Sequence, residues 1–454
     1  MEETLKKDLS VDEEVSTNYR LLYRVDERPE LSVSLLLGFQ NVLTSMGGIV
    51  AVPLIIAGMA GFGVEDTAYL VSAALLASGI VSIIQSRGIG PKFFRVGAGL
   101  PTIMGTDFGF VAPANAIINT MGGGIQGYYG ASILGALIEI FLSYFIKPLM
   151  RFFPPVVTGT VISLIGMTLM PVAFDWAAGG VGSADYGSLR NIAIAFAVFL
   201  IILILNRYGK GIISSASVLI GMVIGYIICI PLGMVEFSKV GEAAWIELPR
   251  IFKYGVDFNP KYVVPFIAGY LVTVIETVGV MKAIGEVTQV DMTDEDIANG
   301  VRADGFGSFI SPFIGSGPVA TFSQNVGLIP LTKCASRFVA IVAGVMLILI
   351  SLFPKFSTII SIMPSPVLGG AGILMFGTVA ASGLQSLSRV EFTNRNLLIV
   401  ASSMGIGLGV TFRPELAEQF PGILGALFSS GISAGTLVAL ILNIILKKEE
   451  EDKE

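Results

Sequence analysis

Several carboxylic acids stand inside long apolar stretches, where an ionisable side chain is costly and therefore a candidate functional group, and Glu276, Asp107 and Asp304 are the main candidates. Glu276 lies in the middle of the run Val274–Gly279. A carboxyl among apolar neighbours can carry a proton, as a proton-coupled carrier requires, or can simply bond to a neighbouring helix. Asp107 could bind a substrate, a cation or a proton, or could simply cap a half-helix that begins there. Asp304 could be an inward structural or coupling group, pair with Arg302, or act as a cap.

Neutral amides form a second set of candidates, because they offer hydrogen-bond donors and acceptors without bringing charge into hydrocarbon. Gln324 and Asn325 lie in the stretch 317–333, which is too polar and too rich in glycine and proline for an ordinary spanning helix. Gln40 and Asn41 interrupt the first apolar stretch, where such amides either line a site or join helices.

Four further residues have a plain structural explanation beside a functional one. Phe108 could stack on a planar ring, although most aromatic side chains in a membrane core only pack. Glu139 could be a buried carboxyl at a helix contact. Lys282 and Glu286 are i,i+4 neighbours, a spacing that favours a pair reaching for the membrane surface over a binding site.

The element that must position the amides is irregular. Pro318 fixes its own φ and biases Gly317 away from helix, while Gly327 and Pro330 limit any helix that follows. The sequence therefore predicts a short extended segment feeding a half-helix. In a membrane such backbone is tolerated only where it is buried in protein or lines a cavity, and transporters place it at the substrate site.

Composition indicates a polytopic membrane protein. The 454 residues are 53% hydrophobic and only 14% charged, with a mean hydropathy of +0.80, whereas soluble domains carry about a quarter charged residues. There is no histidine, so any proton relay must use carboxylates, and a histidine-based metal site is excluded. Cys229 and Cys334 form no disulfide or metal pattern. No nucleophile–base pair, metal motif or phosphate loop suggests an enzyme.

Residues 1–32 are polar and acidic and do not resemble a signal peptide. Basic residues gather in alternate short loops, which predicts fourteen spans with both termini cytoplasmic in the cell membrane. The expected segments, of which 97–119 and 317–332 are irregular, are 33–58, 66–86, 97–119, 124–146, 149–173, 189–206, 211–234, 262–287, 295–315, 317–332, 336–353, 357–382, 394–411 and 422–446.

An internal repeat is visible. The run 155–159 with Gly166 matches the run 366–370 with Gly377 at a constant offset of 211 residues. Likewise, Pro101 precedes Asp107 by six residues, just as Pro318 precedes Gln324. Seven spans per half is an odd number, so the second half must insert upside down relative to the first. Inverted repeats of this kind are typical of transporters.

The chain resembles the nucleobase–ascorbate transporters, also called nucleobase:cation symporter-2, in their xanthine and urate branch. The ten-position signature Gln324-Asn325-x-Gly327-x-x-x-x-Thr332-Lys333 carries the resemblance, which covers about 20–446. Further matching segments are Glu276-Thr277-x-Gly279, Asp304-Gly305, Gly105-x-x-Phe108, Pro364-x-Pro366-Val367-Leu368-Gly369-Gly370 and the lead-in Val25-Asp26-Glu27-Arg28-Pro29.

The resemblance implies an all-α fold of two inverted seven-span repeats, with short extended segments in spans 3 and 10. It implies an elevator motion of a core domain against a gate domain that supports a homodimer. The implied division is a cytoplasmic tail at 1–32, core spans 1–4 at 33–146, gate spans 5–7 at 147–236, an extracellular loop at 237–261, core spans 8–11 at 262–353, gate spans 12–14 at 354–446, and a cytoplasmic tail at 447–454.

It also implies roles for single residues. Glu276 matches the glutamate that hydrogen-bonds the base and couples protons, and Gln324 matches the residue that reads the ring edge. Phe108 matches an aromatic position lining the base, while Asn325 and Asp304 match positions supporting affinity and coupling. Xanthine and urate carriers have glutamine at position 324, whereas uracil carriers have glutamate and ascorbate carriers have proline.

Two departures from the family pattern leave the base and the coupling ion open. The usual Gln-His is here Gln40-Asn41, and Asp107 replaces a small hydroxyl residue. The leading hypothesis is proton-coupled import of xanthine or urate, with no cofactor and no nucleic-acid partner. The alternatives are a uracil or broad nucleobase carrier, coupled to protons or Na⁺, and an anion carrier or channel of the related sulfate and bicarbonate architecture.

Overall fold

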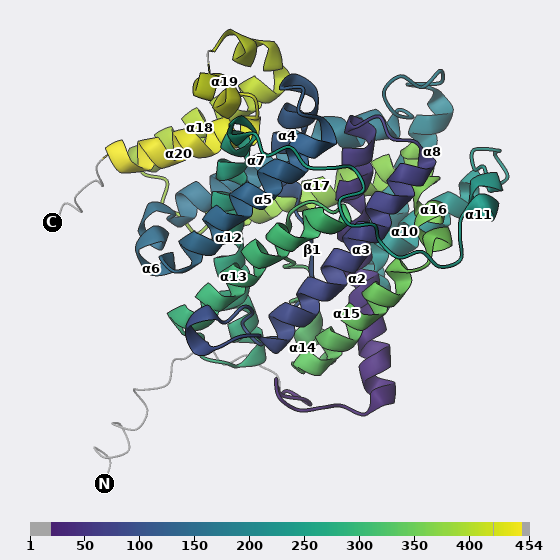
Figure 1. The fold of residues 1–454 in the computed structure, drawn as a ribbon, viewed down its shortest axis with the longest axis horizontal. Helices are drawn as coiled ribbons and strands as arrows, with labels where there is room; N and C mark the ends of the chain where they lie inside the picture. Colours follow the sequence, from purple (N-terminus) through teal and green to yellow (C-terminus); the bar gives the residue numbers. More distant parts are fainter. Residues whose placement is uncertain (1–19, 421, 447–454) are drawn as a thin grey trace.

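The computed structural model describes residues 20–420 and 422–446 and shows helices packed around a small β-element (Figure 1). The remaining parts of the two predicted tails lie outside the described residues. Within the described residues, eight helices are long and apolar enough to cross a membrane. They are α2 (Leu31–Met59), α3 (Val64–Arg87), α5 (Gly124–Ser143), α7 (Pro155–Ala177), α8 (Leu189–Tyr208), α12 (Pro260–Thr288), α17 (Ser365–Leu387) and α18 (Asn394–Phe412).

A ninth candidate span is the pair α15 (Arg337–Ser351) and α16 (Pro354–Ser361), which is bent by 82°. Three expected segments are divided. The expected bounds 357–382 are wrong, since α16 ends at Ser361 and α17 begins at Ser365, on either side of Pro364, which cannot continue a helix. Segment 211–234 contains α9 (Ile212–Ser215) and α10 (Ser217–Cys229), and 422–446 contains α19 (Gly422–Phe428) and α20 (Gly431–Ile445).

The two stretches expected to be irregular meet in the interior. Strand β1 (Met104–Thr106) pairs antiparallel with β2 (Val319–Thr321), and all six residues are buried. This pairing satisfies backbone groups that hydrocarbon could not. β1 leads into the short helices η2 (Phe108–Phe110), α4 (Val111–Asn115) and η3 (Ala116–Thr120), whereas β2 leads through a turn into α14 (Leu328–Thr332).

The two runs that share the 211-residue offset begin corresponding helices. Pro155 opens α7 and Pro366 lies in the first turn of α17. The two helices pack backbone against backbone, since a Cβ added to Gly166 would lie 2.3 Å from Ala380 N and one added to Gly383 would lie 2.3 Å from Ser163 N. Small residues permit this close approach, as is usual between membrane helices.

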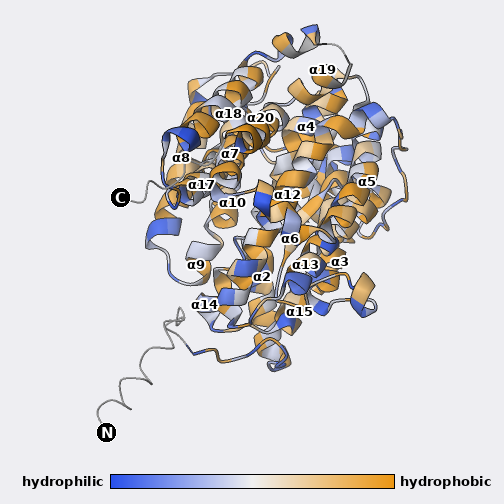
Figure 2. Ribbon diagram, turned by 90° about the vertical axis from the view of Figure 1, so that its left-hand side faces the viewer, coloured by the Kyte–Doolittle hydropathy of each residue, from blue (hydrophilic) through white to orange (hydrophobic). Residues whose placement is uncertain are grey.

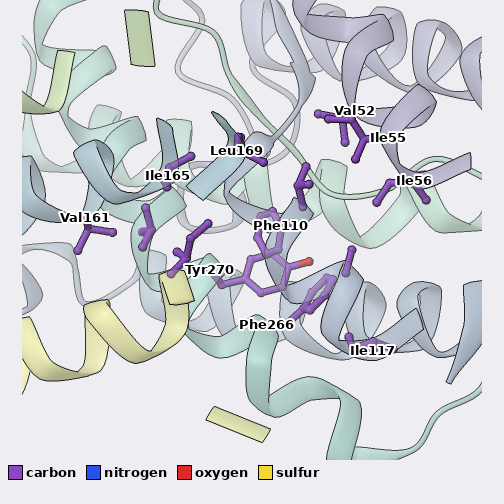
Figure 3. Close-up of a cluster of buried hydrophobic side chains, with 14 of the residues drawn as sticks. Val52, Ile55, Ile56, Phe110, Ile117, Val161, Ile165, Leu169, Phe266 and Tyr270 are labelled. Atoms are coloured by element: carbon purple, nitrogen blue, oxygen red, sulfur yellow. The ribbon is translucent and has the colours of Figure 1, made fainter. Parts of the chain in front are cut away.

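Aromatic side chains fill the interior where the first irregular stretch meets α12. Phe110 lies with its ring centre 4.6 Å from that of Tyr270 and 5.1 Å from that of Phe266, among aliphatic residues of α2 and α7 (Figure 3). Hydrophobic residues predominate along the helices (Figure 2). Only 22% of the apolar stretch of α18 is buried within the protein, so much of this helix is available to contact lipid.

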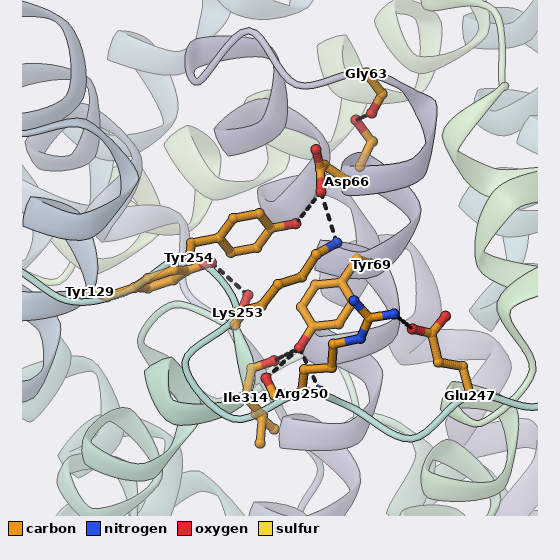
Figure 4. Close-up of polar contacts among 11 residues, drawn as sticks. Gly63, Asp66, Tyr69, Tyr129, Glu247, Arg250, Lys253, Tyr254 and Ile314 are labelled. Atoms are coloured by element: carbon orange, nitrogen blue, oxygen red, sulfur yellow. Dashed lines mark hydrogen bonds and ion pairs between the residues drawn. The ribbon is translucent and has the colours of Figure 1, made fainter.

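The loop expected at 237–261 contains α11 (Ser238–Glu242) and a stretch fixed to the start of α3 (Figure 4). Lys253 Nζ lies 2.8 Å from Asp66 Oδ1, and the Tyr254 hydroxyl donates to the same oxygen at 2.9 Å. The Tyr69 hydroxyl donates to the carbonyl of Arg250 at 2.7 Å. Burial raises the pKa of the Tyr254 phenol above its ordinary value, and the hydrogen bond to the Asp66 carboxylate raises it further.

Candidate functional site

Glu276 lies on α12, where its side chain is half-buried. No hydrogen bond or ion pair joins its carboxyl to any residue that the structure describes. The carboxyls that act on it electrostatically are those of Asp107 and Asp304. Three residues along the helix, Gly279 is exposed, and a Cβ added there would meet nothing within 4 Å. This face of α12 is therefore open at Glu276.

Two threonines next to Glu276 attach α12 to two buried aspartates. Thr273 Oγ1 donates to Asp107 Oδ2 at 2.8 Å, and Thr277 Oγ1 donates to Asp304 Oδ2. The spacing of four residues places both threonines on one face of the helix. The two aspartates therefore fix the helix that carries Glu276.

Asp107 uses both carboxylate oxygens within the protein. Its Oδ1 accepts from the backbone N–H of Gly109 at 2.7 Å, which caps η2, while Oδ2 accepts from Thr273. Its side chain is only 8% exposed. The structure thus gives Asp107 the capping position, and the cap is joined to α12.

Asp304 is fully buried in α13 (Asp294–Ile310) and accepts from Thr321 on β2 through both the backbone N–H (3.2 Å) and Oγ1 (2.8 Å). Its position inside the helix rules out a capping role. The suggested pair with Arg302 is also wrong. That guanidinium bonds Ser143 Oγ and the carbonyl of Arg95, among other groups, because it points towards the end of α5.

Gln324 lies in the turn after β2 with an exposed side chain. Gln324 and Phe322 pack closely against Gly48 of α2. A Cβ added to Gly48 would lie 2.9 Å from Gln324 Nε2 and 3.1 Å from the Phe322 ring. A Cβ on Gly105 of β1 would lie 2.3 Å from the same ring. No hydrogen bond joins the Gln324 amide to a described residue.

The structure brings Asn325 and Asn41 together. Asn325 Nδ2 donates to the Asn41 carbonyl at 3.1 Å and to Asn41 Oδ1 at 3.0 Å, which joins the second irregular stretch to α2. Asn325 Oδ1 is buried without a partner in the described part of the chain. Gln40 is 4% exposed and is not hydrogen-bonded to the other candidates.

Phe108 is half-buried, and its ring meets that of Phe376 on α17 edge-to-face, with 5.4 Å between ring centres. Its ring therefore lies between the first irregular stretch and a helix of the other expected domain. Among residues 20–420 and 422–446, no group of three or more His, Cys, Asp or Glu could hold a metal ion.

Sequence reasoning predicted no positioning role for the residues that hold the candidates in place: Thr273, Thr277, Thr321, Gly48 and Gly105. The i,i+4 threonines beside Glu276 were a usable signal, because hydroxyls on one face of a buried helix need acceptors. Gly105 belongs to a segment that resembles the family, but the sequence does not show that it or Gly48 packs against Phe322, since the chain contains 54 glycines.

Residues 32–416 match the model of the Permease family. A Clostridium perfringens protein named as a putative purine permease is 52% identical, over 97% of this chain and 96% of that protein. The xanthine permease of Bacillus subtilis is 41% identical, over 91% and 93%. The uric acid transporter of Escherichia coli is 40% identical, over 90% and 85%.

Solved structures show the same fold at low identity. The transmembrane domain of a cyanobacterial bicarbonate transporter superposes with a TM-score of 0.58 and 14% identity, covering 93% of this chain and 99% of that one. Murine Solute Carrier 26 family member A9, an anion transporter in the inward-facing state, superposes with a TM-score of 0.60 and 12% identity, covering 98% and 74%.

The fold is therefore that of a helical membrane transporter, and the sequence selects the family within it. The chain belongs to the Permease family, matches the nucleobase–ascorbate transporters whose signature it carries, and is an integral membrane transporter rather than an enzyme.

Proposed function

We propose that this protein imports a purine nucleobase, xanthine or urate, held between Glu276 and Gln324. One observation carries the proposal: the half-buried Glu276 carboxyl and the exposed Gln324 amide have no hydrogen bond to any described residue. By contrast, the carboxylate oxygens of Asp107 and Asp304 accept hydrogen bonds from other residues of the protein. The relatives named for purine, xanthine and uric acid support this substrate class.

The chemistry of a purine dione suits these two groups. Such a ring is flat and carries alternating N–H and C=O groups, which a carboxyl and a carboxamide can complement. Phe108 supplies an aromatic face at the edge of the site. Leaving one of these groups unpaired in a dry site costs about 1–3 kcal/mol, which is enough to select among bases.

Proton coupling is assigned to Glu276. Its carboxyl is free to exchange a proton when the base binds, whereas loss of the Asp107 or Asp304 carboxylate would release α12 from its threonine contacts. In this assignment Asp107 and Asp304 support coupling by positioning Glu276. Na⁺ is the alternative coupling ion.

The transport motion is proposed to be an elevator of a core domain (33–146 and 262–353) against a gate domain (147–236 and 354–446). Fourteen spans in two inverted repeats, a homodimer through the gate, the loop 237–261 outside and cytoplasmic tails at 1–32 and 447–454 complete this proposal. The packing of α7 on α17, both in the gate, supports a rigid gate.

The leading alternative is a uracil or broad nucleobase carrier, because the departures at Asn41 and Asp107 alter the surroundings of the site. An anion carrier is a weaker alternative, since the anion transporters share the fold at 12–14% identity but the sequence relatives are permeases of bases.

The test is uptake of labelled xanthine into proteoliposomes with and without a pH gradient. Glu276→Gln should abolish gradient-driven accumulation, whereas Glu286→Gln, which removes an exposed carboxyl of the same helix, should retain it. Competition by urate, uracil, guanine, hypoxanthine and ascorbate identifies the base. Accumulation by Glu276→Gln at the wild-type level would overturn the proton assignment, and competition by uracil alone would favour the alternative substrate.

A further inference from the structure

The segment before α2, residues 22–29, includes the lead-in named above and is hydrogen-bonded to the start of α15. Leu22 N donates to the carbonyl of Lys333 at 2.8 Å, and Ala335 N donates to the carbonyl of Tyr23 at 2.8 Å. Farther along, Arg337 N donates to the carbonyl of Val25 at 3.0 Å. Residues 22–25 thus run beside residues 333–337, and the transport proposal makes no use of this arrangement.

This attachment places Arg28 at a cavity of about 570 Å³ between the end of α3 and the start of α15. Arginines from three parts of the chain line the cavity, together with apolar side chains of the two helices. The lining residues are Arg28, Ile83, Arg87, Gly88, Arg337, Phe338 and Ile341.

A fourth guanidinium adjoins the wall. A Cβ added to Gly99 would lie 3.1 Å from Arg95 Nη2 and 3.3 Å from Arg337 Nη1, so the two side chains approach each other there. A Cβ on Gly88, which lines the cavity, would lie 2.7 Å from the Arg95 guanidinium. Like charges brought this close create a positive potential that favours a bound anion.

Asp26, Glu27 and Glu30 are the carboxylates nearest to Arg28 in the sequence, and none of them pairs with Arg28 or Arg87 in the described part of the chain. Arg337 forms an ion pair with Asp26, and Arg28 lies over the Phe338 ring with 4.2 Å to its centre. Arg87 makes no ion pair or hydrogen bond with any residue that the structure describes. Arg28 and Arg87 therefore keep guanidinium N–H groups available for an anion.

We propose that this cavity binds the headgroup of an anionic glycerophospholipid. Arg28 and Arg87 would hold the phosphate, because guanidinium groups bind phosphate oxygens through paired N–H donors. Ile83, Phe338 and Ile341 give the cavity an apolar side along two membrane helices, which suits acyl chains and not a free phosphate ion. Basic pockets between membrane helices are a known setting for such lipids.

The acyl chains would lie on the outer surface of the α3–α15 pair. These helices leave no space between them, since a Cβ on Gly79 would lie 2.6 Å from the carbonyl oxygen of Gly344. One lipid would thus contact the lead-in, α3 and α15 together. Its binding should stabilise this part of the molecule.

The experiment measures thermal unfolding of the full-length protein in detergent, with added cardiolipin, phosphatidylglycerol, phosphatidylcholine or inorganic phosphate, together with lipid retention in native mass spectrometry. The anionic lipids should raise Tm and remain bound, whereas phosphatidylcholine and phosphate should not. The double variant Arg28→Gln/Arg87→Gln should unfold at the wild-type Tm without lipid but lose the lipid-induced rise and the retained lipid.

Arg207→Gln is the matched control, since Arg207 is an exposed arginine at the end of α8 and does not line this cavity. It should keep the full response to anionic lipid. An equal response to phosphatidylcholine, an equal response to phosphate alone, or full lipid retention by the double variant would each overturn the proposal. A double variant that unfolds at lower Tm without lipid but still loses retention relative to Arg207→Gln would support it.

Discussion

The two interrupted segments that meet at the β1–β2 pair differ in what they do with their polar side chains. In the first segment (104–115), Asp107 turns back onto Gly109 N and Thr273, and it is buried. In the second segment (319–332), Gln324 projects from the turn and remains exposed. The first segment therefore holds α12 in place, and the second presents a group with unused hydrogen-bonding capacity. In the proposed site, the first segment supports α12 and the second reads the base.

The largest effect is expected from removing the support. Asp107→Ala leaves the Gly109 N–H and the Thr273 hydroxyl without their acceptor, at a cost of about 1–3 kcal/mol for each buried group. Thermal unfolding of the purified protein should show a clear fall in Tm. The Tm of Asp107→Asn, which keeps an acceptor oxygen, should fall less. If Asp107→Ala unfolded at the wild-type temperature, the supporting role would be refuted.

Changing the reading side should leave stability almost intact and alter binding. Gln324→Ala removes an exposed amide, so the free energy of unfolding should change by about 0.5 kcal/mol or less. Affinity for xanthine should fall about tenfold, the equivalent of a hydrogen bond worth about 1.4 kcal/mol. Gln324→Glu should shift preference from xanthine towards uracil. Equilibrium binding of xanthine and uracil measures both the affinity and the preference. If neither changed, Gln324 would not contact the base.

The contact between the segments can be tested at Gly105. Gly105→Ala puts a methyl group 2.3 Å from the Phe322 ring, an overpacking that costs about 1–3 kcal/mol and displaces the base of the Gln324 turn. Both Tm and xanthine affinity should fall. The control is Gly409→Ala on α18, where a Cβ would meet nothing within 4 Å. Equal behaviour of the two variants would show that Phe322 does not position the turn.

The smallest effect is expected at the link between the second segment and α2. Asn41→Ala removes the side-chain half of the bond from Asn325 but leaves the backbone carbonyl of residue 41 as an acceptor. We expect a loss of about 0.5–1.5 kcal/mol in stability and less than a tenfold change in binding. A larger loss of binding than Gln324→Ala causes would mean that Asn41 itself contacts the base.

The sequence was sufficient to predict the features set by local chemistry. Proline and glycine around 317–330 predicted the interruption, and the apolar lengths predicted most helices, but Pro364 was not recognised as the break between α16 and α17. The resemblance identified the family. What could not be predicted depends on tertiary contact: that Asp304 binds Thr321 and not Arg302, or that Gly48 and Gly105 leave room for Phe322. These contacts form between segments that are far apart in the chain, so the sequence of one segment does not predict them.

The most direct test of the central claim is an experimental structure of the protein with bound xanthine. We expect the ring between α12 and the turn after β2, within about 2.7–3.2 Å of both the Glu276 carboxyl and the Gln324 amide. A ring bound out of reach of either side chain would contradict it.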